Sequence, residues 1–185
     1  APDPGLSIDY HDVPDRFSLV GCMVASGLLV KWFAEVFAPD LGSGEDRYAR
    51  LDAEAAPTPP GADGLVVLPY FLGEKTPIFD ADARGMISGL TLAHRRGHLF
   101  RAVLEAVAYG FRHHVDVLVE GGHPIRSIRI MDRGARSPLW RQIVADVLGR
   151  SIEYAPGADL GSAFGVAWVA GVAPGAWGWS RAPEP

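Results

Sequence analysis

The chain has 185 residues, of which 48% are hydrophobic and 21% are charged, a composition typical of a globular protein with one sizeable core. The formal net charge of −5 argues against nucleic acid as a partner, because such a surface needs clustered Lys and Arg. The single cysteine, Cys22, excludes an internal disulfide and favours a reducing compartment, so we expect a cytoplasmic protein. No apolar run approaches the roughly 18 residues that span a bilayer, and no membrane partner is expected.

The first part of the chain is predicted to form a strand, a helix and a polar loop. It opens with Ala-Pro-Asp-Pro-Gly and no Met, as inside a surface loop, so we expect a fragment of a longer protein. A short strand is predicted at 17–21 and a helix over 24–37, whose apolar side chains recur on one face until Pro39 ends it. Residues 38–63 are polar and rich in Pro and Gly, with at most a turn of helix at 48–54.

Strands and helices alternate from residue 65 onward. The predicted strands cover residues 65–72, 85–90, 125–131 and 152–154, and the predicted helices cover 98–119, 139–148 and 163–172. This order is typical of an α/β fold whose helices pack on a mostly parallel sheet. We expect Leu65, Ile87 and Ile128 to lie in strands of that one sheet.

The stretch from Gly85 to Glu105 ends a strand on glycine, turns polar and opens the longest helix. This stretch resembles a signature of the FGGY carbohydrate kinases, the sugar-phosphorylating branch of the actin-like ATPases. The matching residues are Gly85, Gly89, His98-Leu99 and Ala102-Val103-Leu104-Glu105. The resemblance runs from about Asp9 to Trp177, but it matches only the C-terminal half of such a kinase.

That resemblance has direct implications for fold and domain organisation. It implies a ribonuclease H-like (actin-like ATPase) C-terminal domain that lacks its first strands. Residues 1–185 would then be the nucleotide-binding domain of a two-domain enzyme, and the N-terminal domain would be the missing partner.

Residues 128–142 read as an apolar strand, a tight turn and a helix. Ser137 is a good N-cap, and Pro138 suits the first helical position. Backbone N–H groups at such a turn can bind phosphate or adenosine, and a glycine lets the ligand approach the backbone. In the kinases that the chain resembles, this turn lies against the adenosine half of ATP. The resemblance implies that Gly134 and Ala135 contact the nucleotide and that Ser137 and Pro138 line the adenine pocket; a plain β-α connection is the alternative.

Arg133 departs from the family pattern, because the kinases carry a glycine there. If the position needs a positive φ, arginine costs of order 1 kcal/mol. Its side chain would obstruct the pocket, swing to solvent or reach a phosphate. We therefore expect that Arg133→Gly tightens ATP binding several-fold in the full-length protein.

A second, shorter stretch resembles the phosphate-facing segment of the family. Residues 20–32 contain a small-residue turn and a helix that ends in a polar residue before Trp32. The resemblance implies that Gly27 and Lys31 face the nucleotide phosphates. A helix-surface Lys31 in solvent is the alternative reading. Residues 165–171 are similar to the closing small-residue helix of the family.

No metal ligands are expected in this chain. Asp80 and Asp82 are two apart in a loop, where acids are more often solvated or capping than part of a cation site. His94 and His98 have a metal-compatible spacing but lack a third ligand nearby. His113-His114 is expected to face solvent.

The resemblance implies an ATP-dependent kinase that phosphorylates a pentulose, such as xylulose or ribulose, or a polyol. Mg²⁺ would be held mainly by the nucleotide phosphates in the full-length enzyme. The catalytic Asp belongs to the missing N-terminal half, so the chain alone is expected to be inactive. The alternative is a degenerate, non-catalytic structural or dimerisation domain, and a homodimer stays open as a partner.

Overall fold

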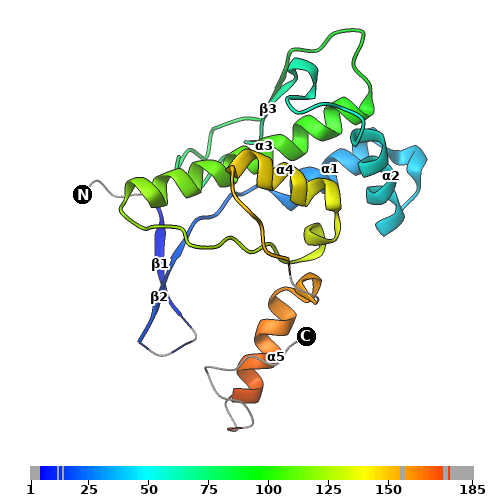
Figure 1. Cartoon of the computed structure of the whole chain (residues 1–185). Helices are drawn as coiled ribbons and strands as arrows, with labels where there is room; N and C mark the ends of the chain where they lie inside the picture. Colours follow the sequence, from blue (N-terminus) through cyan, green and yellow to red (C-terminus); the bar gives the residue numbers. More distant parts are fainter. Residues whose placement is uncertain (1–4, 12, 14, 155–156, 173–174, 176–185) are drawn as a thin grey trace.

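One long helix, α3 (Arg96–Glu120), organises the domain. The structure is a computed structural model that describes residues 5–11, 13, 15–154, 157–172 and 175 (Figure 1). Three helices pack against α3, and their bounds are α1 (Gly27–Phe37), α2 (Glu45–Ala55) and α4 (Pro138–Leu148). Every residue from Phe100 to Ala108 is buried, so this part of α3 is enclosed on all sides.

The core lies where α1 and α2 meet the buried half of α3. Phe33 and Phe100 are fully buried there, with ring centroids 5.4 Å apart. Gly97 allows the close approach of α3 to α2, because a Cβ at this position would lie 2.1 Å from the Glu54 carbonyl oxygen. The predicted helices over 24–37, 98–119 and 139–148 are confirmed within a few residues at each end.

α2 is a helix in a region that was expected to be mostly loop. Its sequence is polar, and only Leu51 and Ala55 are buried, so it offers almost no apolar period. Glu45 and Asp46 occupy its first turn, where negative side chains favour the helix dipole. Arg96 of α3 binds Glu54 at 2.5 Å. Tertiary contacts therefore stabilise a helix that the local pattern barely indicates.

The strands form two separate antiparallel pairs. β1 (Ser7–Tyr10) pairs with β2 (Phe17–Val20), and β3 (Val66–Leu68) pairs with β4 (Met86–Ser88). β1 was not predicted, whereas the strands at 17–21, 65–72 and 85–90 are confirmed in shorter form.

The mostly parallel sheet is not present among the described residues. Leu65 precedes the strand that pairs with Ile87, and Ile128 belongs to neither two-stranded sheet. The expected strands at 125–131 and 152–154 make a single parallel bridge, Arg129 to Glu153. The expectation of one sheet was wrong for this chain, because periodicity identifies an extended segment but not the strand beside it.

A buried polar seam fastens residues 21–24 to α3 and to the loop before β4. Thr76, only 1% exposed, accepts a hydrogen bond from Cys22 N and is 2.9 Å from His114 Nε2. The Glu74 carboxylate accepts a hydrogen bond from Val24 N at 3.1 Å. His114 is therefore half-buried and hydrogen-bonded within the domain, so the prediction that it faces solvent was wrong; His113 is exposed as expected.

The last described helix, α5 (Ser162–Val172), projects from the domain (Figure 1). None of its described side chains is buried. The 3-10 helix η4 (Ala158–Leu160) precedes it and packs on another 3-10 helix, η3 (Arg133–Arg136). No helix in the described part of the chain is both long and apolar enough to cross a bilayer.

Candidate functional site

The turn at residues 132–138 folds as η3 followed directly by α4. Ala135 N donates to Asp132 O at 3.0 Å, and Ser137 N donates to Gly134 O at 3.1 Å. Ala135 is fully buried, whereas Gly134 is exposed at the surface of the turn. Burial of Ala135 anchors the turn, and the Gly134 backbone is left exposed.

The unusual backbone conformation belongs to Asp132 and not to Arg133. Asp132 has φ 67° and ψ −176°, a region that is populated almost only by glycine. Arg133 has no positive φ and begins η3. The condition for strain at Arg133, a positive φ, is therefore not met; the positive φ lies one residue earlier, because sequence position alone does not say which residue of a turn reverses the chain.

Arg133 also leaves Gly134 uncovered. Its side chain is 83% exposed and lies 3.7 Å from Glu45 at the start of α2. Of the three orientations expected from the sequence, the structure has the one toward solvent. A Cβ added to Gly134 would make only ordinary contacts, the nearest at 3.4 Å from Trp140 Nε1, so close packing inside the domain does not demand this glycine.

Ser137 and Pro138 begin α4 as the sequence predicts. The Ser137 hydroxyl accepts a hydrogen bond from Trp140 N at 3.0 Å, which caps the helix, and Pro138 is its first residue. Burial raises the pKa of the neighbouring Asp52 carboxyl, and a hydrogen bond with Ser137 offsets part of that rise. The hydroxyl of Ser137 is thus engaged by the domain itself.

Gly27 and Lys31 lie on a different element, the first two turns of α1. Gly27 is exposed, and a Cβ there would meet no atom within 4 Å. Ser26 precedes it without a side-chain capping bond, and Leu29 N donates to the Ser26 carbonyl oxygen at 3.1 Å, so no side chain covers the first turn of α1 at Gly27. Lys31 is exposed and lies 3.8 Å from Glu35. In this structure it is a helix-surface lysine in solvent, as the alternative interpretation of the sequence expected.

The structure brings five of the seven predicted residues together and holds the other two apart from them. The five are Arg133, Gly134, Ala135, Ser137 and Pro138, in one turn. Gly27 and Lys31 share no hydrogen bond or ion pair with that turn in the described part of the chain. Both sets nevertheless present a glycine without a covering side chain.

Sequence reasoning missed the ionic contacts that surround the turn. Arg136 binds Glu45 of α2 and Asp159 of η4. Arg141 donates to the Ala135 carbonyl oxygen and stacks on Tyr154, with its guanidinium carbon 4.5 Å from the ring centroid. The spacing of Glu45 and Asp52, seven residues apart, was the available signal, since such residues share one face of a helix.

No group of three His, Cys, Asp or Glu side chains in the described residues has the arrangement of a metal site. His98 Nε2 is 3.2 Å from Asp63 Oδ2, an intramolecular pair at the start of α3. Asp80 Oδ1 accepts a hydrogen bond from Asp82 N at 2.8 Å, which agrees with a capping role for that acid.

Comparison with known proteins identifies the family. The model of the FGGY family of carbohydrate kinases, C-terminal domain, matches residues 1–174. The chain belongs to this family. The xylulose kinase of Escherichia coli K12 is 33% identical over 172 residues, which cover 93% of this chain and 34% of that protein. The gluconokinase of Bacillus subtilis is 34% identical over 144 residues, covering 74% of this chain and 28% of that protein.

Solved structures of FGGY kinases superpose well on this chain. A xylulose kinase from Rhodospirillum rubrum has a TM-score of 0.79 and 50% identity, and the match covers 96% of this chain and 35% of that one. A xylulose kinase from Brucella ovis has a TM-score of 0.82 and 28% identity, covering 100% of this chain and 37% of that one. The ribonuclease H-like, actin-like fold class is thereby confirmed. The chain spans about a third of the length of these relatives.

Proposed function

We propose that this FGGY chain is the nucleotide-binding C-terminal domain of a two-domain, ATP-dependent sugar kinase. The observation that carries the proposal is the family match over residues 1–174, together with two similar xylulose kinase structures. The substrate is a pentulose such as xylulose or ribulose, or a polyol. Gluconokinases among the relatives make a sugar acid the competing acceptor class.

In this proposal the chain contributes positioning. Bound MgATP supplies the phosphoryl group and most of the metal ligands. The exposed backbone of Gly134 accommodates the adenosine half, and the open first turn of α1, at Gly27, faces the phosphates. Lys31 would leave Glu35 to reach a phosphate oxygen. Catalysis of this transfer depends on positioning and charge stabilisation from both sides of the reacting group.

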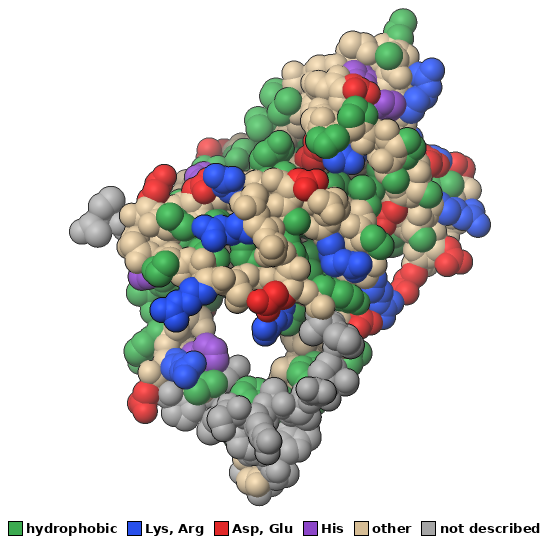
Figure 2. Space-filling model, viewed as in Figure 1, with side chains coloured by type: hydrophobic (Ala, Val, Ile, Leu, Met, Phe, Trp, Pro, Cys, Tyr) green, Lys and Arg blue, Asp and Glu red, His purple; other side chains and the backbone are tan. Residues whose placement is uncertain are grey.

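The exposed β1–β2 hairpin supports a partner domain outside this chain. The β1–β2 hairpin exposes Ile8, Tyr10 and Phe17, which are 68%, 88% and 66% exposed. Figure 2 shows hydrophobic side chains at the surface over this hairpin. An isolated two-stranded hairpin is only marginally stable in water, so these side chains suit contact with further polypeptide.

The proposal is tested with ATP, Mg²⁺ and a panel of pentuloses, polyols and gluconate. The full-length protein should release ADP in a sugar-dependent manner, fastest with one pentulose or polyol. The 185-residue chain alone should not, because it holds neither the proton acceptor nor the sugar site. Sugar-dependent turnover by the isolated chain would refute the proposal that another domain supplies the sugar site and the proton acceptor. A full-length protein that binds no ATP would favour the alternative, a degenerate structural or dimerisation domain.

A further inference from the structure

Three segments that are distant in the sequence meet at Arg136. Its Nη1 lies 2.7 Å from Glu45 Oε2 of α2, and its Nη2 lies 2.6 Å from Asp159 Oδ2 of η4. The Arg136 Nε also donates to Asp159 at 3.0 Å. The hydrogen bonds with Arg136 lower the pKa of Asp159, so this carboxylate is charged near neutral pH. One guanidinium therefore links α2, the turn and the segment that leads into α5.

This link lies at the start of the segment that leads into α5. None of its described residues is buried, and it projects away from the other helices (Figure 1). In the described part of the chain, packing of η4 on η3 joins the segment that leads into α5 to the rest of the domain. The Arg136–Asp159 pair lies within that contact, so it sets where α5 begins relative to Gly134.

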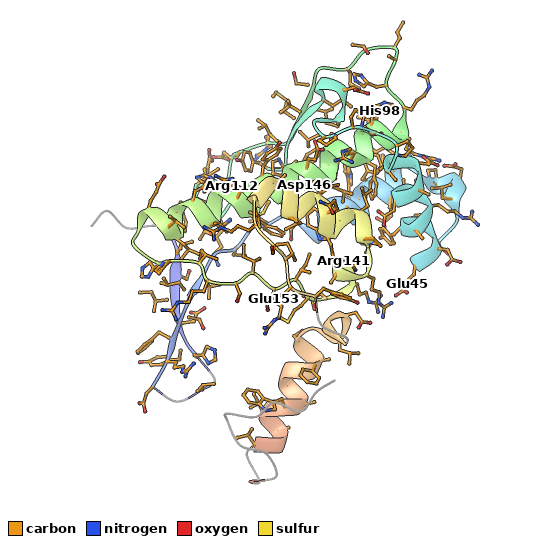
Figure 3. The ribbon with its side chains drawn as sticks, in the orientation of Figure 1. Glu45, His98, Arg112, Arg141, Asp146 and Glu153 are labelled. Carbon is orange, nitrogen blue, oxygen red and sulfur yellow. The ribbon has the colours of Figure 1, made fainter. Side chains whose placement is uncertain are left out.

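α2 supports the turn at a second point. Glu45 and Asp52 are seven residues apart and share one face of α2. Glu45 binds Arg136, and Asp52 interacts with the Ser137 hydroxyl, so two consecutive residues of the turn contact the same helix face. Figure 3 labels Glu45 at the end of α2 nearest the turn, and Figure 2 shows acidic and basic side chains interleaved along this side of the domain.

We propose that Arg136 is a positioning residue for nucleotide binding. Its ion pair with Asp159 holds the η4–α5 segment against the 132–138 turn, and its ion pair with Glu45 fixes the arginine to α2. The inference rests on the proposed function, because it assumes that the turn binds ATP. Arg136 acts through its two carboxylate partners and does not itself contact the nucleotide. Its side chain is about half exposed, so the effect on affinity is moderate and decreases with salt.

The test compares isosteric carboxylate variants with one control in the full-length protein. Asp159→Asn and Glu45→Gln each remove one charge and keep the side-chain shape, and Arg136→Ala removes the link altogether. Asp116→Asn is the matched control, since Asp116 forms an exposed pair with Arg112 at 2.7 Å, far along α3. MgATP affinity is measured by calorimetry, KM for ATP and for the sugar by steady-state kinetics, and hydrogen exchange of residues 157–165 without nucleotide.

A positioning role predicts the same direction for all three variants. Each should weaken MgATP binding by about three- to tenfold, raise KM for ATP but not for the sugar, and speed exchange at 157–165. The control should change none of these quantities. If Asp159→Asn or Glu45→Gln tightens MgATP binding, the released Arg136 is a direct phosphate ligand and the inference is wrong. Unchanged affinity and exchange in Arg136→Ala would also overturn it.

The two proposals fail in different ways. Wild-type protein that binds no MgATP refutes the proposed function. Wild-type protein that binds MgATP with an affinity insensitive to Arg136→Ala leaves the kinase intact and refutes the positioning role alone.

Discussion

The Asp132 carboxylate lies directly against Gly161: a Cβ added to Gly161 would come within 1.7 Å of Asp132 Oδ1. The contact joins the residue before η3 to the residue after η4. Gly161 also has φ +50°, a conformation that side chains other than glycine disfavour. Both the space and the backbone at this junction therefore require a glycine.

We predict that Gly161→Ala destabilises the protein by about 2 kcal/mol, from displacement of Asp132 and from strain at a positive φ. Urea unfolding measures the change. Gly122→Ala is the control, because Gly122 also has a positive φ but an added Cβ there meets no atom within 4 Å, so only the strain remains. In the Asp132→Gly background the Gly161→Ala cost should fall to about 1 kcal/mol, the strain alone. An equal cost in both backgrounds would show that the two residues are independent.

Substitutions by glycine at the two neighbouring turn positions should have opposite effects. Asp132→Gly relieves a conformation that costs about 1–3 kcal/mol, so a stabilisation of about 1 kcal/mol is expected. Arg133→Gly loosens a residue with ordinary helical geometry and should destabilise by about 0.5–1 kcal/mol. We also expect Arg133→Gly to change ATP affinity less than about twofold, because the arginine neither strains the turn nor covers Gly134. Parallel urea titrations measure the two stability changes, and calorimetry measures ATP affinity. A several-fold gain in ATP affinity for Arg133→Gly would show that the Arg133 side chain obstructs the nucleotide pocket after all.

The buried ion pair on α3 should show strong coupling between its partners. Glu105 accepts hydrogen bonds from Arg101 Nε at 2.8 Å and from Gly61 N at 3.0 Å, and both side chains are buried. Glu105→Ala should cost about 3–5 kcal/mol, since it leaves a buried guanidinium without its partner.

Arg101→Met combined with Glu105→Leu should recover much of that loss, because no buried charge remains. The exposed Arg112–Asp116 pair is the control and should couple by less than about 1 kcal/mol. Additive effects at positions 101 and 105 in a double-mutant cycle would contradict the prediction.

Two carboxylates on α2 should give opposite pH dependences. Burial raises the pKa of Asp52 above that of an unfolded Asp, so its contribution favours folding most at low pH and is lost as pH rises through the folded pKa. Asp52→Asn should therefore stabilise the protein at pH 7 and have little effect near pH 3. The Arg96 guanidinium lowers the pKa of Glu54, so Glu54→Gln should destabilise at pH 7, with the loss fading as pH falls below about 4. Unfolding curves between pH 3 and 8 measure both signs.

The sequence was informative where one pattern determines one element. The apolar stripe of α3, the Ser137-Pro138 start of α4 and the glycine-rich motifs gave the helices, the turn and the family. α2 and the polar seam at Thr76 were not predictable, because both are stabilised by residues more than 40 positions away, such as Arg96 for α2 and Cys22 for Thr76. The prediction of strand pairing was wrong for the same reason: the pattern of an extended segment such as 125–131 does not indicate which strand pairs with it.

The candidate site was predictable as a turn but not as an assembly. The Ser137 cap of α4 followed from local chemistry and the choice of Gly134 from the family resemblance. The bond from Arg136 to Glu45 spans 91 residues, and no local sequence pattern indicates it. The placement of positive φ at Asp132 was equally hidden, since adjacent residues of a turn differ in backbone geometry without differing in pattern.

The exposed β1–β2 hairpin has a practical consequence for work with this chain. Unpaired strand edges with apolar side chains template edge-to-edge aggregation unless charge, proline or a covering segment blocks them. β1 carries one acid, Asp9, between the exposed Ile8 and Tyr10. Solubility, more than folding, will therefore limit the concentration at which the isolated chain can be handled, and a charged residue in place of Tyr10 is the direct remedy.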